Sequence, residues 1–450
     1  MGLTRDVSEF VAGMAYERIP AQAIPIVKNA FIDTIAVAVA GSEEDCSRIV
    51  KEVAREEQAA QIASVWGAGW KTTAIHAALV NGTMSHALDY DDVNSRATLG
   101  HPSTAIVPAV VAVAEEVGAS GKDMILAYFT GFEVMAYIGK VMSFRHYSRG
   151  FHGTATMGVL ACTAAAGKLY GLSAEQMGHA FAIAVSHAAG VHRNYGTMTK
   201  PLHPGKAARD GIMAAKLAKK GFTGGADIFE APKGLLEVYG EGRPMTSEKI
   251  GDTVELLNTG LSVKKYPSCY CTHRSIDAIQ ELSVKHGITA DQVARIHVKV
   301  PPGVLMPLIY SRPQKGLEGK FSMEYTVAAM LVDGKVNFAS FTDEMVQRPE
   351  IQALIQKITK EEDPSIEVKA GGVEEGHVDV TVTLHDGTAY THRIHNPKGS
   401  AEWPLTAEEL KDKFMDCMQG NIETDRANRL YGFLAALEQA ESARSLSGLL

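Results

Sequence analysis

The chain has 450 residues, of which 46% are hydrophobic and 21% charged, a composition typical of a globular protein with a large core. Its 44 Lys and Arg residues against 52 Asp and Glu residues give a formal charge of −8, which argues against a general nucleic-acid binder. No apolar run reaches the roughly 18–20 residues that a membrane span needs, and the N-terminal segment lacks the apolar stretch of a signal peptide.

Chain length and cysteine usage lead to two further expectations. Single cores tend to split beyond roughly 250–300 residues, so we expect two domains. The five cysteines are scattered and odd in number, which disfavours a disulfide framework and indicates a reducing, cytoplasmic location. We expect neither a nucleic-acid nor a membrane partner.

Up to about residue 260 the chain is rich in Ala, Val, Met and Gly and predicts one helix after another. Residues 104–118 are apolar on nearly all sides, which predicts a buried helix. Capping boxes that begin at Ser120 and Ser173 open two further helices. Because no strand pattern of useful length appears here, this half is predicted to be all-α.

Beyond about residue 265 the pattern changes to the alternation of half-buried strands. Strands are expected at 295–300, 365–370, 377–384 and 388–394, with Asp386-Gly387 as a tight turn before the last of them. Helices are expected at 322–334 and 340–358. Three or four antiparallel strands with these helices predict a small α+β domain.

A helical pattern returns after a capping box that begins at Thr406, and another helix is expected at about 423–441. We expect this tail to pack back on the first domain, so that the small domain is an insertion. The predicted fold is therefore mainly α, with a large all-helical domain (1–264, completed by 400–450) and a smaller α+β lid domain (265–399).

Familiar cofactor motifs do not occur in the sequence. It contains no GxxxxGK[ST] phosphate loop, GxGxxG, HExxH, CxxC or GxSxG, and Cys269-x-Cys271 is too closely spaced for the usual zinc pair. We therefore expect no metal and no cofactor, and an enzyme of this sequence would use its own side chains as acids and bases.

Residues 86–92 (HALDYDD) are the densest polar cluster in an otherwise apolar region. Aspartates near a helix C-terminus oppose the helix dipole, so three together are locally unfavourable. A diphosphate–magnesium site would use DDxxD, but Asp91-Asp92 are followed by Val, Asn and Ser, and no second copy exists. The other interpretation is a solvated helix end.

Three loops place a basic side chain just ahead of a predicted helix. His101 precedes a helix with Ser103 or Thr104 as its cap, His152 precedes an Ala-rich helix, and Lys200 stands before a proline, in extended backbone, ahead of a helix at 206–220. Helix N-termini bind anions. One such histidine alone is more often structural, but three alike favour a converging carboxylate pocket.

Local charge supports this hypothesis. Residues 193–209 carry Arg193, Lys200, Lys206 and Arg209, and residues 263–274 carry Lys264, Lys265 and Arg274, with no acid in either stretch. Two basic stretches in an acidic protein suggest a small anionic ligand, and a lysine among other cations has a lowered pKa, which suits a general base. The alternative is that both stretches are ordinary solvated loops.

Several of these segments together resemble the MmgE/PrpD, or 2-methylcitrate dehydratase, family. The matching stretches are HALDYDD, GHPS, FHGTATMG, GTMTKPLHPGKAARDG, KKYPSCYCTH and GKFSMEY, in the family's order and along essentially the whole chain. The resemblance implies a homodimer, cofactor-independent chemistry and a small polycarboxylate substrate. Activities of the family include 2-methylcitrate dehydration, cis-aconitate decarboxylation and iminodisuccinate epimerisation.

The resemblance also implies the site residues. It places Asp89, His101, His152, Lys200 and Lys264 in catalysis and Arg193, Thr199, Lys265, Cys269 and Tyr325 in substrate binding, Tyr325 being the weaker match. The decarboxylases of the family have histidine at Cys269 and threonine at Val93, and the loop 93–100 looks closer to the epimerases, so decarboxylation is disfavoured.

These observations lead to a hypothesis about the chemistry. Cationic groups and helix N-termini would clamp the carboxylates of the substrate and stabilise charge that develops at the neighbouring carbon. Lys200 or His152 would transfer the proton at that carbon, and His101, paired with Asp89, would be the second acid/base. We expect a dehydratase-type lyase first and an epimerase second, with a non-catalytic carboxylate-binding protein as the alternative from another class.

Overall fold

The structure, a computed structural model, describes residues 2–240, 248–368 and 375–450. The chain forms two compact units: unit 1 comprises Met1–Arg193, Met198–Leu261 and Thr406–Leu450, and unit 2 comprises Asn194–Thr197 and Ser262–Leu405. The C-terminal segment therefore returns to unit 1 after the chain has built unit 2. The boundaries predicted from the sequence are 264/265 and 399/400.

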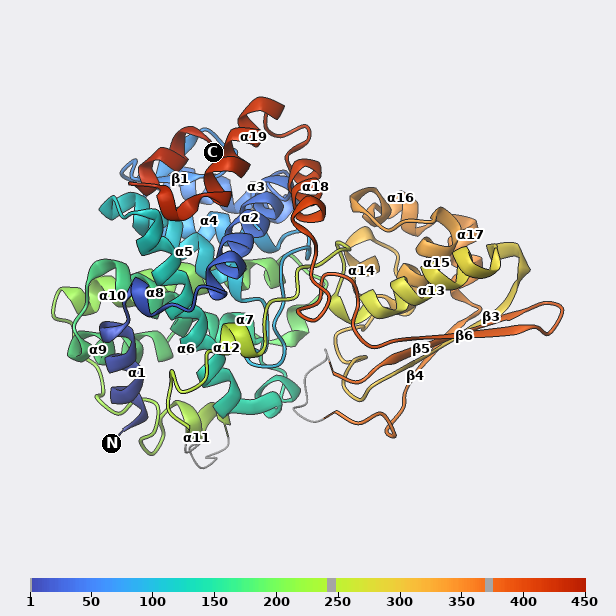
Figure 1. Cartoon of the computed structure of the whole chain (residues 1–450), viewed down its shortest axis with the longest axis horizontal. Coiled ribbons are helices and arrows are strands. Elements are labelled where there is room, and N and C mark those ends of the chain that lie inside the picture. Colours follow the sequence, from blue (N-terminus) through green and yellow to red (C-terminus); the bar gives the residue numbers. More distant parts are fainter. Residues whose placement is uncertain (1, 241–247, 369–374) are drawn as a thin grey trace. The chain divides into compact units, whose positions relative to one another are not determined.

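Unit 1 consists of helices and one short hairpin. Its helices are α1 (Leu3–Gly13), α2 (Ala23–Ala40), α3 (Asp45–Glu56), α4 (Ala74–His86), α5 (Pro102–Val117), α6 (Gly121–Ser148), α7 (Gly153–Thr156), α8 (Gly158–Tyr170), α9 (Ala174–Val185), α10 (Thr199–Lys219), α11 (Leu235–Gly240), α12 (Glu255–Asn258), α18 (Ala407–Met418) and α19 (Thr424–Ala435). The tail helices α18 and α19 pack on α2 (Figure 1).

The local signals in this part of the sequence are confirmed. Capping boxes at Ser120, Ser173 and Thr406 open α6, α9 and α18, and α5 is almost entirely buried. The all-α prediction needs one correction, because β1 (Ala63–Val65) and β2 (Trp70–Thr72) form an antiparallel hairpin. Strands of three residues are too short for alternation to reveal.

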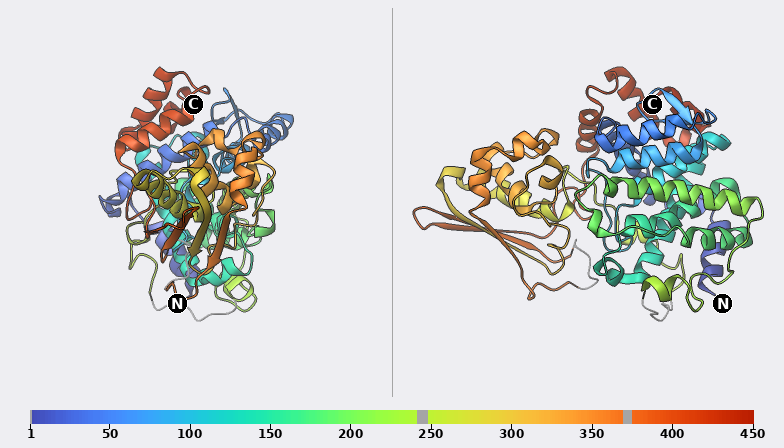
Figure 2. Two further views of the ribbon diagram at one scale, coloured as in Figure 1. Left: turned by 90° about the vertical axis from the view of Figure 1, so that its right-hand side faces the viewer. Right: turned by 180° about the vertical axis from the view of Figure 1, so that it is seen from behind.

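Unit 2 is an α+β unit with a four-stranded sheet. Its strands are β3 (Val293–Val300), β4 (Ile358–Glu362), β5 (Val378–Leu384) and β6 (Ala389–Ile394), and its helices are α13 (His273–His286), α14 (Gly316–Gly319), α15 (Met323–Asp333), α16 (Asp343–Val346) and α17 (Pro349–Ile355). The strand order is β4-β3-β5-β6, and α13 and α15 pack on the sheet (Figures 1 and 2). The predicted class, mainly α with an α+β part, is confirmed.

Two details of unit 2 differ from the prediction. Residues 365–368, where a strand is expected, are irregular, and 369–370 lie outside the described residues. The strand in this part of the chain is instead β4, which runs parallel to β3 rather than antiparallel. The helix expected at 340–358 is divided into shorter pieces, and Pro349 begins the last of them. A proline fits the first turn of a helix but not its interior, so it separates α16 from α17.

Two helices of unit 1 are apolar over long stretches. By length and composition alone α2 and α6 are long enough to cross a membrane, which corrects the expectation that no segment reaches this length. However, 67% of the apolar window of α2 and 83% of that of α6 are buried in the structure, as in the core helices of a globular protein.

Candidate active site

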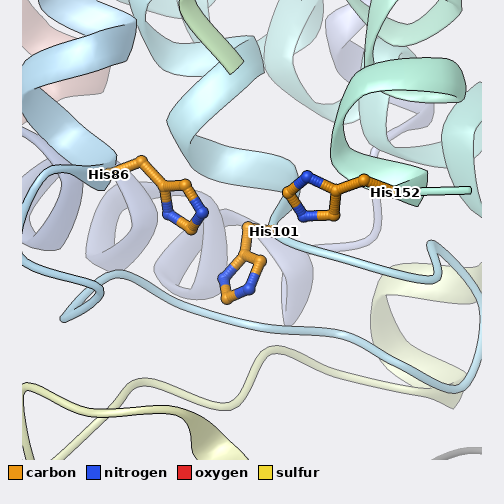
Figure 3. Close-up of side chains that lie close together, drawn as sticks. All are labelled: His86, His101 and His152. Atoms are coloured by element: carbon orange, nitrogen blue, oxygen red, sulfur yellow. The ribbon is translucent and has the colours of Figure 1, made fainter. Parts of the chain in front are cut away.

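Four of the predicted site residues, Asp89, His101, His152 and Lys200, meet in unit 1. The rings of His101 and His152 have centroids 6.2 Å apart, and both lie near the ring of His86, at 4.5 and 6.1 Å. Figure 3 shows these three rings gathered from the end of α4 and the starts of α5 and α7. The prediction that separate helix termini converge on one site is therefore confirmed for these residues.

The helix termini differ in detail from the prediction. His101 is the residue before α5 and Pro102 is its first residue, so neither Ser103 nor Thr104 caps this helix. Lys200 is not in extended backbone, because α10 already begins at Thr199 and not at 206. Pro201 did not prevent this, since the N–H groups of a first turn have no partner within the helix.

Lys200 forms a buried ion pair with Asp89. Its ammonium donates to Asp89 Oδ1 at 2.8 Å and to His86 Nε2 at 2.9 Å, and 6% of its side chain is exposed. This corrects two expectations. The direct neighbours of Lys200 are a carboxylate and an imidazole rather than other cations, and Asp89 pairs with Lys200 rather than with His101. Asp89 has a positive φ of 54°, a backbone region that non-glycine residues seldom occupy.

Asp91, which the sequence analysis did not select for catalysis, bridges two imidazoles. Its Oδ1 lies 2.8 Å from His86 Nδ1, and its Oδ2 lies 2.7 Å from His101 Nδ1. His101 Nδ1 also lies 2.9 Å from the carbonyl of Asp92. Because these partners only accept, each Nδ1 is assigned the proton, and each Nε2 carries the lone pair. The orienting carboxylate of His101 is thus Asp91, not Asp89.

Burial keeps the inner histidines neutral. It lowers the pKa of His86 to about 3, against the attraction of Asp91 and together with the positive charge of Lys200. Burial and the neighbouring His203 lower the pKa of His152 well below its usual value, and the two Nδ1 atoms lie 2.8 Å apart. His101 is the histidine among them with some exposure, 12% of its side chain, so its ring is the most accessible of the cluster.

Asp92 belongs to a neighbouring neutral network. Its carboxyl group accepts from the hydroxyl of Ser103, whose Oγ lies 2.6 Å from the hydroxyl of Tyr128. Burial raises the pKa of Asp92 to about 8. Asp89, Asp91 and Asp92 are at most 3% exposed, which overturns the interpretation of this cluster as a solvated helix end.

The first basic stretch is less cationic in the structure than in the sequence. Lys206 and Arg209 both bind Asp210, at 2.8 Å, which stands one position beyond the acid-free stretch. Arg193 and Thr199 are exposed. Their role in substrate binding stays a prediction.

The remaining predicted residues lie in unit 2. The side chain of Lys264 is fully buried there, Lys265 lies 3.4 Å from Asp277, and Cys269 is 8% exposed. Tyr325 is buried in α15, and its hydroxyl donates to the carbonyl of Ser340, a packing role within its own unit. The roles of these residues in catalysis and binding stay predictions.

The described cluster contains residue types that bind metals, since His86, His101 and His152, or His86, Asp89, Asp91 and His101, lie close enough to hold an ion. However, Lys200 already donates to His86 Nε2 and to Asp89. An added cation would face this ammonium at short range and compete for the same lone pairs. The donor set therefore favours the lysine as the cation of the cluster.

His86, Asp91 and His203 are the residues that sequence reasoning missed. His86 and Asp91 belong to the HALDYDD motif, and His203 to the PLHPG motif. Both motifs were identified from the sequence, but these three residues were not recognised as members of the site. The five-residue separation of His86 and Asp91 across a helix end was the available signal, but it does not reveal which carboxylate binds which imidazole.

Comparisons with known proteins concern the whole chain and not single residues of the site. Models of the MmgE/PrpD N-terminal and C-terminal domains match residues 5–248 and 266–439, which confirms the resemblance. Cis-aconitate decarboxylases of Mus musculus and Aspergillus terreus are 29% and 26% identical over 100% of this chain, which covers 94% and 96% of their lengths. The 2-methylcitrate dehydratase of Cupriavidus necator is 24% identical over 97% of this chain and 90% of its own length.

Proposed function

The chain belongs to the MmgE/PrpD family, and we propose that it is a lyase that acts on a small tricarboxylate by proton transfer at a carbon next to a carboxylate. The observation that carries this proposal is the Asp91–His101 pair, at 2.7 Å, next to the buried Lys200–Asp89 pair. An imidazole whose tautomer is fixed by a carboxylate is a suitable acid/base at neutral pH.

The geometry distributes the roles among the side chains. His101, with its Nδ1 held by Asp91, presents Nε2 to the substrate. In the imidazolium form of the ring, Nε2 also carries a proton and would give it to the leaving hydroxyl, which departs as water. We assign His152 the proton transfer at carbon, because its ring lies beside that of His101, with centroids 6.2 Å apart. Lys200 already donates two hydrogen bonds, so we assign it the stabilisation of negative charge that develops on the substrate carboxylate.

Dehydration is the reaction that we place first. The relatives include both cis-aconitate decarboxylases and 2-methylcitrate dehydratases, and both reactions require proton transfer next to a carboxylate. The resemblance to the family implies that Cys269 and Val93 stand where its decarboxylases carry histidine and threonine, which argues for dehydration. We further propose that the activity needs neither metal nor cofactor, so dialysis against a chelator should leave the rate unchanged.

Proton NMR in D2O tests the proposal directly. The purified protein is offered 2-methylcitrate, citrate, cis-aconitate and iminodisuccinate, with His101→Asn as the inactive variant and His286→Asn, an exposed histidine of unit 2, as the control. We expect conversion of a hydroxy-tricarboxylate to an alkene, slowed about 10²–10⁴-fold in His101→Asn alone.

Other outcomes assign other reactions. A product that has lost carbon dioxide from cis-aconitate would establish a decarboxylase. Deuterium incorporation with loss of chirality and no new product would establish an epimerase. Saturable binding without turnover or proton exchange on any of the four compounds would contradict the lyase and favour a binding protein.

A further inference from the structure

A lysine of the C-terminal tail reaches residues 87–92, here called the aspartate loop, which carry Asp89 and Asp91. Lys413 lies on α18 (Ala407–Met418), and its ammonium donates to the backbone carbonyl of Tyr90 at 2.8 Å. We propose that Lys413 is a positioning residue for the reaction, because it holds the loop from which Asp89 and Asp91 reach their partners. This inference rests on the proposed function and adds to it a residue more than 300 positions along the chain.

The ammonium of Lys413 is buried among polar and aromatic partners. Its ammonium lies 2.6 Å from Asp33 Oδ1, and the exposed fractions of the two side chains are 4% and 0%. It also lies 3.9 Å from the centroid of the Tyr90 ring. One ammonium therefore binds a carboxylate of α2, a carbonyl and an aromatic face of the aspartate loop, and all of these groups belong to unit 1.

Tyr90 is the residue through which Lys413 would act. It stands between Asp89, which binds Lys200, and Asp91, which binds His86 and His101. Asp89 occupies the left-handed backbone region, with φ of 54°, and such a conformation persists only where its surroundings hold it. Fixing the carbonyl of Tyr90 restrains the backbone on which both carboxylates are carried.

A structural role predicts something different from a positioning role. If Lys413 only neutralised the buried charge of Asp33, removing both charges together would restore the protein in full, because a buried pair is often replaceable by neutral groups. If Lys413 positions the loop, the same double variant folds but still lacks the contact to Tyr90. The pair Asp33→Asn/Lys413→Met separates the two cases.

The experiment measures kcat, KM and the melting temperature for this double variant, for Asp33→Asn and for Lys413→Arg. Lys411→Met, an exposed lysine of the same helix, is the matched control. We expect kcat of the double variant to fall at least tenfold with KM within about threefold of wild type. The kcat of Asp33→Asn, which keeps the contact between Lys413 and Tyr90, should fall less. Lys413→Arg should recover part of the loss, because a guanidinium can donate to the same carbonyl. A double variant that is folded and has the wild-type kcat would overturn the inference.

A second readout does not depend on turnover. In protein labelled with ¹⁵N-histidine, the imidazole nitrogens of His86 and His101 report the hydrogen bonds to Asp91. We expect their shifts to change in the folded double variant and to stay unchanged in Lys411→Met. Unchanged shifts in the double variant would refute the positioning role. If the shifts change but the wild type turns over no tricarboxylate, the contact of Lys413 with the loop would be supported. Only the proposed function would then be rejected.

Discussion

Asp91 accepts hydrogen bonds from His86 and His101 at once, so a single carboxylate determines which nitrogen of each ring is protonated. Asp91→Asn would offer an amide that can donate as well as accept, which permits the wrong tautomer of His101. We expect kcat to fall by about 10²-fold or more with KM little changed, because general acid–base catalysis contributes this much.

Steady-state kinetics on the compound identified by NMR check this prediction. The matched control is Asp412→Asn, which changes an exposed aspartate of α18 in the same way. A wild-type kcat in Asp91→Asn would show that the tautomer of His101 does not limit the reaction.

Asp92 leads to a pH-dependent prediction, because its carboxyl is buried and its pKa is raised to about 8 from 3.8. Between these two pH values the folded protein holds a proton that the unfolded chain has lost. The contribution of this group to the free energy of unfolding is therefore fully present below pH 4. It is lost as the pH rises from 4 to 8, by at most about 1.4 kcal/mol per pH unit.

Asp92→Asn removes this titration, since an amide stays neutral throughout the range. Urea unfolding at pH 5 and pH 8 should show the stability of Asp92→Asn gaining on that of the wild type as the pH rises. A constant difference between the two proteins at both pH values would contradict the raised pKa.

Sequence reasoning identified the residue types of the site but not their pairing. Asp89, His101, His152 and Lys200 were each found from a local motif, and the structure brings them together. The pairing of His101 with Asp91 instead of Asp89 depends on the path of the backbone through Asp89, whose φ is positive. Spacing along a sequence does not contain that torsion.

The elements that carry the site are held at close range by two glycines. A Cβ on Gly205 of α10 would lie 2.3 Å from the carbonyl oxygen of Leu79 in α4, and a Cβ on Gly82 would lie 2.7 Å from Gly205 Cα. The backbones of α4 and α10 therefore touch, and these helices carry His86 and Lys200.

Gly205→Ala should push these two helices apart. We expect a loss of about 1–3 kcal/mol in unfolding free energy, as for other overpacked sites, and a lower kcat because the 2.9 Å contact between His86 and Lys200 lengthens.

The matched substitution Gly432→Ala lies in α19, where an added Cβ meets nothing within 4 Å. It should stabilise the protein by about 0.5–1 kcal/mol and leave kcat unchanged. Denaturant unfolding and kinetics on both variants test the pair. Equal effects of the two substitutions would show that the close approach of α4 and α10 is unimportant.

Elements with a local signal were predictable, and those that depend on tertiary contacts were not. Capping boxes marked the starts of α6, α9 and α18 because the cap is made within four residues. The early start of α10 was missed because its first turn contains a proline, and β4 was missed because its pairing partner, β3, lies about 60 residues away.

At the scale of the whole molecule, unit 1 is built from segments that precede and follow unit 2 in the sequence. The tail contributes Leu410, Phe414, Leu430 and Leu434 to its core, each at most 3% exposed, besides the ion pair of Lys413 with Asp33. Loss of one such side chain typically costs about 2–5 kcal/mol, and a domain has only about 5–15 kcal/mol in total. A fragment that ends at residue 261 should therefore not fold.

Unit 2 differs because 262–405 is continuous and lacks only Asn194–Thr197 of that unit. We expect fragment 262–405 to unfold in one cooperative transition, whereas fragment 1–261 should show none until a second chain, 400–450, is expressed with it. Circular dichroism during urea unfolding measures both. Cooperative unfolding of 1–261 alone would show that the tail is not part of its core. A featureless transition of 262–405 would show that continuity of the chain does not make this unit autonomous.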